Sequence, residues 1–88
     1  MSDSYRPLAC DRHDYLEIAC LYGYRLRIEL TDGSWLEGRA LDTRTLPNKE
    51  EVLLVQVAGA TRQLRQDRLR AITSLTPGAR FGRIELQS

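Results

Sequence analysis

Long hydrophobic runs and an excess of charge of one sign are both missing from this sequence of 88 residues. No segment approaches the roughly 18 consecutive apolar residues that a membrane-spanning helix needs. The opening MSDSYRPLACDR also lacks the apolar centre of a signal peptide. Thirteen lysines and arginines oppose twelve aspartates and glutamates, so no net charge draws the chain toward nucleic acid or an acidic membrane. We therefore expect a cytoplasmic protein that does not contact a membrane.

Cysteine and histidine are scarce. The chain has two cysteines, Cys10 and Cys20, and one histidine, His13. A zinc site normally takes more ligands than these, arranged in closely spaced pairs. Without an export signal, both thiols are expected to stay reduced and to act as small packing residues. We predict no metal site and no cofactor.

Catalytic motifs are absent as well. The sequence contains no glycine-rich phosphate loop, no serine in a nucleophile motif and no carboxylate pair within an apolar run. An enzyme is therefore the class of protein that the sequence favours least, and we predict that the chain is not one.

What is present is the composition of a folded protein. Hydrophobic residues make up 42 % and charged residues 28 %, which argues against disorder. A chain of this length forms one domain, residues 1–88, and buries roughly 60 to 65 % of the surface that its unfolded chain would expose. Acidic residues gather near the start of the chain and arginines later, so the fold can present two faces of opposite sign. These groups are Asp3, Asp11, Asp14 and Glu17, and Arg62, Arg65, Arg68 and Arg70.

A helix is predicted over residues 10–22, after an extended arm at 1–9. Asp11 is expected to cap the helix by accepting a hydrogen bond from the backbone N–H of Asp14. Gly23 is expected to end it. At about 100° per residue the helix is amphipathic and should pack on a sheet. Its apolar side holds Tyr15, Leu16, Ile18, Ala19 and Tyr22, and its solvent side holds His13, Asp14 and Glu17.

Alternating apolar and polar residues predict the first two strands, at 24–30 and 35–42. TDGS at 31–34 is typical of a tight hairpin turn. Gly38 lies in the middle of the second strand and suggests a bend or bulge. A polar loop is predicted at 43–50.

The second half of the chain predicts further short strands, at 51–58, 61–65, 69–75 and 80–86, with turns between them. One helix followed by about five short strands in meander order is the pattern of a small bent-sheet barrel. We predict a mainly β fold with one N-terminal α-helix, in which residues 24–87 form a five-stranded, strongly bent antiparallel barrel.

Two segments are similar to the two Sm motifs. LTDGSWLEGRALD at 30–42 has the leucine, the turn glycine and the second glycine of the first motif. LRQDRL at 64–69 is similar to the second motif, although Gln66 stands where that motif normally has glycine. These matches imply an Sm-like barrel.

A more specific resemblance covers nearly the whole chain. The matching segments are YRPLACDRHDYLEIAC at 5–20, LTDG at 30–33 and AGATRQLRQDRLRAI at 58–72, together with the short C-terminal strand. They resemble the Rho-binding antiterminator family, called Rof or YaeO. The resemblance implies a bacterial protein that binds the N-terminal RNA-binding domain of the transcription terminator Rho and blocks entry of RNA at the primary site. Typical members are distinctly acidic, whereas this chain has a formal charge of +1.

The resemblance also implies which residues bind Rho. Asp14 and Glu17 lie one helical turn apart on the solvent side of the helix, so that both carboxylates can meet one basic patch. Without the resemblance, a solvated helix face is the better explanation of both residues, and an acid near a helix N-terminus stabilises the helix without any partner. The further contacts implied are His13, Asp11, Asn48 and Lys49.

The alternative is an Sm-like RNA-binding module. Its contacts would be Arg62, Arg65 and Arg68, with the nearby Arg70 extending the basic stripe toward Trp35 or a tyrosine. The same arginines also suit an exposed strand whose charge prevents edge pairing. Sm barrels often form rings through strand edges, but the N-terminal helix and arm favour a monomer here.

Overall fold

The computed structural model describes residues 7–87 and is mostly β. A single α-helix, α1 (Cys10–Tyr22), precedes the strands, and a short 3-10 helix, η1 (Gln66–Arg68), interrupts them. The prediction of a mainly β fold with one N-terminal helix is confirmed. Most of the expected arm, residues 1–6, lies outside the described residues. The strands are β1 (Arg25–Leu30), β2 (Trp35–Thr45), β3 (Glu51–Val57), β4 (Ala60–Arg65), β5 (Leu69–Ser74) and β6 (Arg83–Glu85).

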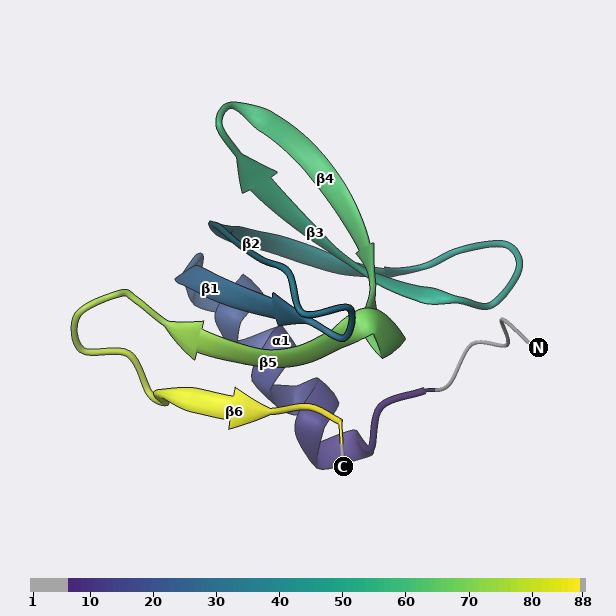
Figure 1. Cartoon of the computed structure of the whole chain (residues 1–88), viewed down its shortest axis with the longest axis horizontal. Helices are drawn as coiled ribbons and strands as arrows, with labels where there is room; N and C mark the ends of the chain where they lie inside the picture. Colours follow the sequence, from purple (N-terminus) through teal and green to yellow (C-terminus); the bar gives the residue numbers. More distant parts are fainter. Residues whose placement is uncertain (1–6, 88) are drawn as a thin grey trace.

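The strands form one antiparallel sheet in the order β4-β3-β2-β1-β5-β6. It has six strands, one at each of the six segments predicted as strands, whereas the predicted barrel counted five; the last strand, β6, pairs with β5. The order also departs from a plain meander, since η1 carries the chain from β4 at one end of the sheet to β5, which pairs with β1. Figure 1 shows the resulting bend: the β3–β4 hairpin stands apart from β1, β5 and β6, and the long β2 runs between the two parts.

Helix α1 covers the predicted residues 10–22, but its N-cap is not the predicted one. Gly23 adopts the left-handed conformation, with φ of 62°, and its N–H reaches the carbonyls of Ala19 and Cys20. Ala9, not Asp11, is the N-cap, and no side chain caps the helix. The Asp11 carboxylate instead accepts from the N–H of its neighbour Arg12 at 3.0 Å. Because the helix starts two residues earlier than an Asp11 cap requires, Asp11 lies inside the first turn.

The buried side of α1 is narrower than predicted. Leu16 and Ala19 are fully buried, and Tyr15 and Ile18 are partly buried against the core. Tyr22, expected on the packed side, is half exposed. Its ring stacks on the ring of Tyr24 and lies under the Arg80 guanidinium, so it covers the edge of the core.

Strand β2 is longer than the sequence suggests. Residues 43–45, expected in a loop, continue the ladder with β3, and only 46–50 form the connection. The polar side chains of this extension face solvent on one side, so their composition resembled a loop. The predicted turn at 31–34 is present, with Gly33 at φ of 91° and its N–H donating to Leu30 O at 3.0 Å.

Gly38 is required by close packing of two strands. A Cβ atom at this position would lie 2.8 Å from the backbone oxygen of Gln56 and 2.9 Å from Cγ2 of Val57. The predicted bulge occurs two residues later, where the register shifts between Ala40 and Asp42. The glycine therefore lets β3 pack closely beside β2, and the bulge bends β2 just beyond this point.

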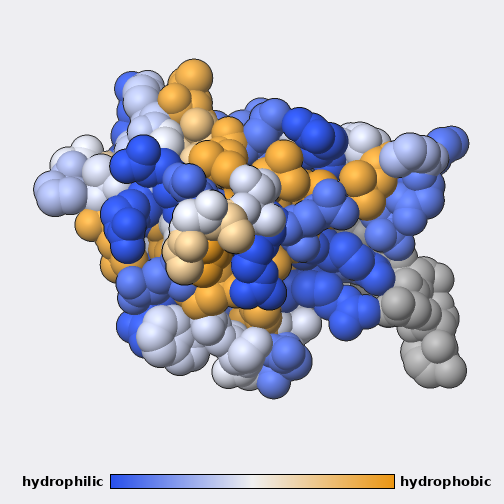
Figure 2. Space-filling view, turned by 90° about the horizontal axis from the view of Figure 1, so that it is seen from above, coloured by the Kyte–Doolittle hydropathy of each residue, from blue (hydrophilic) through white to orange (hydrophobic). Residues whose placement is uncertain are grey.

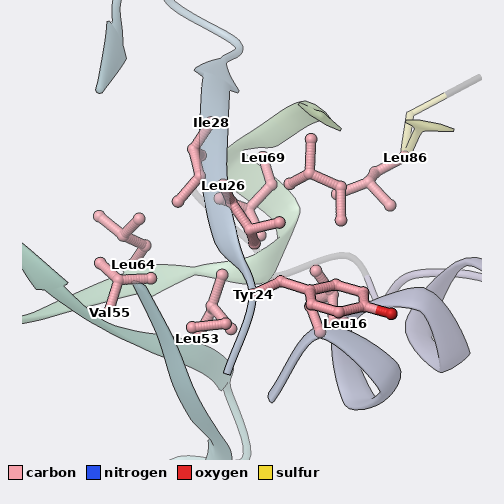
Figure 3. Packing of buried hydrophobic residues seen from close by; sticks show 12 residues of the cluster. Leu16, Tyr24, Leu26, Ile28, Leu53, Val55, Leu64, Leu69 and Leu86 are labelled. Atoms are coloured by element: carbon pink, nitrogen blue, oxygen red, sulfur yellow. The ribbon is translucent and has the colours of Figure 1, made fainter. Parts of the chain in front are cut away.

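The core lies between the bent sheet and α1. Figure 3 shows Leu16 and Tyr24 beside each other at the helix, with Leu53, Val55 and Leu64 from the β3–β4 hairpin on the other side. The C-terminal strand is shorter than predicted. Phe81 lies before it and packs edge-on against Tyr15 and Tyr24, while Leu86 follows it and is buried.

The surface mixes polar and apolar residues. In the view from above, hydrophobic residues reach the surface among hydrophilic ones (Figure 2). Within residues 7–87, no helix is long and apolar enough to span a membrane. The large hydrophobic residues most exposed to solvent are Leu21, Tyr22, Trp35, Leu41 and Leu75.

Candidate protein-binding surface on α1

The two acids singled out in the sequence are exposed on α1. Asp14 and Glu17 are three residues apart and therefore neighbours on the helix surface. Within the described part of the chain, no cation pairs with Asp14. Both carboxylates are thus available to a partner on the solvent side of the helix.

His13 ties this surface to the sheet. Its Nε2 lies 3.2 Å from Oε1 of Glu51, the first residue of β3, and its Nδ1 lies 3.5 Å from Oε2 of Glu17. The side chain is only 23 % exposed. The ring is held between two carboxylates, so its role in this structure is to position α1 and Glu17.

The loop that precedes Glu51 carries the other two predicted contacts. Asn48 is exposed, and its side-chain oxygen accepts from the N–H of Glu50 at 3.0 Å. Lys49 is also exposed and has φ of 71°, and its N–H donates to Leu46 O at 2.8 Å. Because His13 contacts Glu51, the structure brings the base of this loop beside α1.

Asp11 lies one turn before Asp14 and is exposed. Its carboxylate oxygen is 3.7 Å from the guanidinium of Arg12, and the side chains of this pair are 43 % exposed for Arg12 and 73 % exposed for Asp11. The three acids of α1 follow one another at a spacing of three residues and wind gradually around the helix. Asp11 is therefore the acid farthest from Glu17.

One feature of this surface was missed from the sequence. A groove of about 310 Å³ lies between α1 and β2, and we call it the α1–β2 groove. Its pattern is hard to find in the sequence because two distant segments form it. Its lining residues are Glu17, Cys20, Leu21, Leu41, Asp42 and Thr43.

The pKa of the Cys20 thiol reflects the negative charge of the α1–β2 groove. Burial, followed by the negative charges of Asp42 and Glu17, raises the pKa of this thiol to about 11. Cys20 packs partly against the core, as predicted, whereas Cys10 is exposed, so the prediction that both cysteines are packing residues is wrong for Cys10. Both are free thiols.

The arginines of the alternative site do not share one face. Arg62 and Arg65 lie on the same strand, β4, an odd number of residues apart, so their side chains point to opposite sides of it. Arg65 is bound to Asp67, with Nη2 to Oδ2 at 2.7 Å, and lies 3.9 Å from Glu50. Arg68 belongs to η1. Arg65 and Arg68 nevertheless line one hollow beside Asp32, so that, of the three, only Arg62 is set apart from the predicted stripe.

A larger hollow, of about 540 Å³, lies over β1, β2, β5 and β6. Arg27 stacks on the ring of Trp35 at 4.4 Å from its centroid. Arg83 binds Glu29 through two nitrogens, at 2.9 and 3.0 Å, and Glu85 at 3.1 Å. The hydrogen bond from Arg83 holds the pKa of Glu29 below its usual range. Arg27, Glu29 and Arg83 therefore each have a partner within the chain.

Gln66, the departure from the second Sm motif, is fully buried. Its side-chain nitrogen donates to Val52 O at 3.2 Å. This contact joins η1 to β3, so the residue has a structural role. Among residues 7–87, no group of three or more His, Cys, Asp or Glu side chains is placed to hold a metal ion.

Comparison with known proteins identifies the class. A family model described as modulator of Rho-dependent transcription termination (ROF) matches residues 7–86. Protein rof of Escherichia coli strain K12 is 44 % identical over 69 residues, which cover 78 % of this chain and 81 % of that protein. Protein rof of Shigella flexneri gives the same values.

A solved structure agrees with this result. YaeO bound to magnesium, from Vibrio cholerae O395, matches with a TM-score of 0.78 and 27 % identity, over 84 % of this chain and 96 % of that one. The fold and the sequence thus define a small regulator of transcription termination. The chain belongs to the ROF family of modulators of Rho-dependent termination, and the resemblance seen in the sequence is confirmed.

Proposed function

We propose that this protein binds the N-terminal RNA-binding domain of Rho and blocks entry of RNA at the primary site. The observation that carries the proposal is the pair of exposed acids, Asp14 and Glu17, on a helix that His13 fixes to β3. Membership of the ROF family supports Rho as the partner.

The physical mechanism is substitution of carboxylates for phosphates. A protein that binds single-stranded RNA offers a basic groove with aromatic platforms. A carboxylate that meets an arginine or lysine in such a groove makes a charge-assisted hydrogen bond, as a phosphate would. Two acids one helical turn apart engage one basic patch together, and RNA then cannot enter it.

The other predicted residues take supporting roles in this proposal. His13 positions Glu17 through their contact at 3.5 Å. Asn48 and Lys49 form a second contact from the loop at 46–50, whose base lies beside α1. Asp11 adds negative charge at the start of the helix, at the outer limit of the interface.

The formal charge of +1 shapes the kinetics of this binding. Long-range attraction between an acidic inhibitor and a basic groove speeds association and makes it sensitive to salt. A nearly neutral chain gains little from that attraction, so association is slower and less salt-sensitive than for an acidic relative. The protein acts by occlusion, as a cytoplasmic monomer, without enzymatic activity or a cofactor.

Reversal of the two acids tests the site. The variant Asp14→Lys/Glu17→Lys is expected to lose binding to purified Rho, measured by calorimetry, because it turns attraction into repulsion. A matched control, Glu37→Lys/Glu85→Lys, makes the same change in net charge at two exposed acids of the sheet. Circular dichroism should show both variants folded. Unchanged binding by a folded Asp14→Lys/Glu17→Lys variant would overturn the assignment of these residues.

A further inference from the structure

Two leucines of the α1–β2 groove are exposed to an unusual degree for their type. Leu21, on α1, is 76 % exposed, and Leu41, on β2, is 40 % exposed. Both line the same groove, so they form one apolar patch from two elements. Exposed apolar groups that gather in a groove rimmed by polar residues are typical of an interaction site.

The local structure of β2 creates half of this patch. Ala40 pairs with Val55 and Asp42 pairs with Leu54, so Leu41 is the extra residue of the bulge. A bulge changes the direction of the side chains beside it. Here it leaves Leu41 and Asp42, two successive residues, lining the same groove.

The charges of the groove have one sign. Glu17 and Asp42 line it, and among residues 7–87 no lysine or arginine does. Their combined field acts on the Cys20 thiol, whose pKa it helps to raise. An occupant must therefore bring both positive charge and apolar surface to this groove.

We propose that the α1–β2 groove receives an arginine or lysine side chain of Rho, whose methylene groups pack between Leu21 and Leu41 and whose charged end binds Glu17 and Asp42. Long basic side chains combine an apolar stem with a charged end, which matches the two kinds of surface present. An RNA-binding surface is rich in such side chains. The inference rests on the proposed function and extends the interface from α1 onto β2.

This contact also accounts for binding by a nearly neutral chain. Apolar burial against Leu21 and Leu41 does not depend on net charge. Glu17 then takes part in both contacts, since it lines the groove and lies beside Asp14 on the helix. The partner therefore sees one continuous surface.

The first test replaces the two exposed leucines of the groove. Leu21→Ser/Leu41→Ser is expected to weaken binding to Rho about tenfold or more, because partial burial of two leucines is lost. The matched control is Leu75→Ser, at a leucine that is 42 % exposed but lines the larger hollow instead. All substituted leucines face solvent, and circular dichroism should show the fold retained.

The second test removes one charge. Asp42→Asn is expected to weaken binding several-fold and to reduce its dependence on salt, whereas Glu37→Gln, at an exposed acid away from the groove, leaves both unchanged. Sedimentation of the free protein accompanies both tests. Self-association that the two serine substitutions abolish would show that a second copy of the chain occupies the groove, which overturns the proposal.

The outcomes separate the two proposals. If the unmodified protein binds Rho and the leucine variant binds equally well, the groove is not part of the interface, while the proposed function stands. If the unmodified protein does not bind Rho, the proposed function fails, and this inference fails with it. If the unmodified protein binds Rho and the groove variants bind it more weakly while their controls do not, both proposals are supported.

Discussion

His13 and Glu51 join the helix to the sheet, with Nε2 of the histidine 3.2 Å from Oε1 of the glutamate. The second ring nitrogen of His13 lies 3.5 Å from Glu17, one turn further along α1. A single ring thus sets where α1 lies against β3 and where one carboxylate of the proposed interface is held. The proposed binding surface would therefore depend on a side chain that is only 23 % exposed.

Replacement of His13 should therefore affect both stability and binding. His13→Ala is expected to lower the free energy of unfolding by about 0.5 to 1 kcal/mol, because its contacts with Glu51 and Glu17 are lost. It should also weaken Rho binding, because Glu17 loses its neighbour. His13→Gln, which keeps a hydrogen-bonding group, is the control and should lose less of each. Urea denaturation and calorimetry measure the two effects, and equal losses for both variants would contradict a positioning role.

Gly38 offers a test of the close packing of β2 against β3. Gly38→Ala is expected to lower the free energy of unfolding by about 1 to 3 kcal/mol, because its Cβ would overlap the backbone of Gln56 and the side chain of Val57. Gly82→Ala is the matched control, since nothing lies within 4 Å of a Cβ there. Thermal unfolding compares the two variants. If Gly38→Ala is as stable as the unmodified protein, β2 and β3 do not pack closely at this position.

The Cys20 thiol reports on the negative field of the α1–β2 groove. Its pKa is raised to about 11, so at pH 8 less of it is thiolate than in an ordinary cysteine. In a Cys10→Ser background, alkylation of the folded protein should be about tenfold slower than that of the unfolded protein, after allowing for the greater nucleophilicity of a more basic thiolate. The rate should climb as the pH rises toward 11.

Asp42→Asn tests the cause of that shift. Removing this charge should lower the pKa of Cys20 and speed its alkylation at pH 8, because Asp42 is the largest electrostatic contribution after burial. The reaction is followed by mass spectrometry, with Glu37→Gln as the control for a distant acid. An unchanged rate in Asp42→Asn would show that Asp42 does not act on the thiol.

Local patterns in the sequence predicted much of the fold. The alternation around Leu26 and Ile28 and the glycine at position 23 determine a strand face and a helix end by short-range rules, and the structure agrees with both. The N-cap of α1 was predicted wrongly, because Asp11 suits a cap and a first turn equally. The pairing of β5 with β1 depends on η1, whose turn is not evident from composition.

The candidate binding surface, too, could be predicted only in part. Exposure of Asp14 and Glu17 follows from helical periodicity alone. The contact of His13 with Glu51 and the groove between Leu21 and Leu41 join segments far apart in the sequence, so periodicity cannot reveal them. A strand at 80–86 was predicted from the sequence, but its pairing with β5 could not be inferred from local alternation.

The most direct test of the account is a competition titration. Purified Rho is mixed with a labelled pyrimidine-rich oligonucleotide, this protein is added in increasing amounts, and a parallel series omits Rho. Occlusion of the primary site predicts that the oligonucleotide is displaced from Rho and that none binds in the series without Rho. Retention of the oligonucleotide by Rho at saturating amounts of this protein would contradict the account, and direct binding in the control series would identify an RNA-binding module instead.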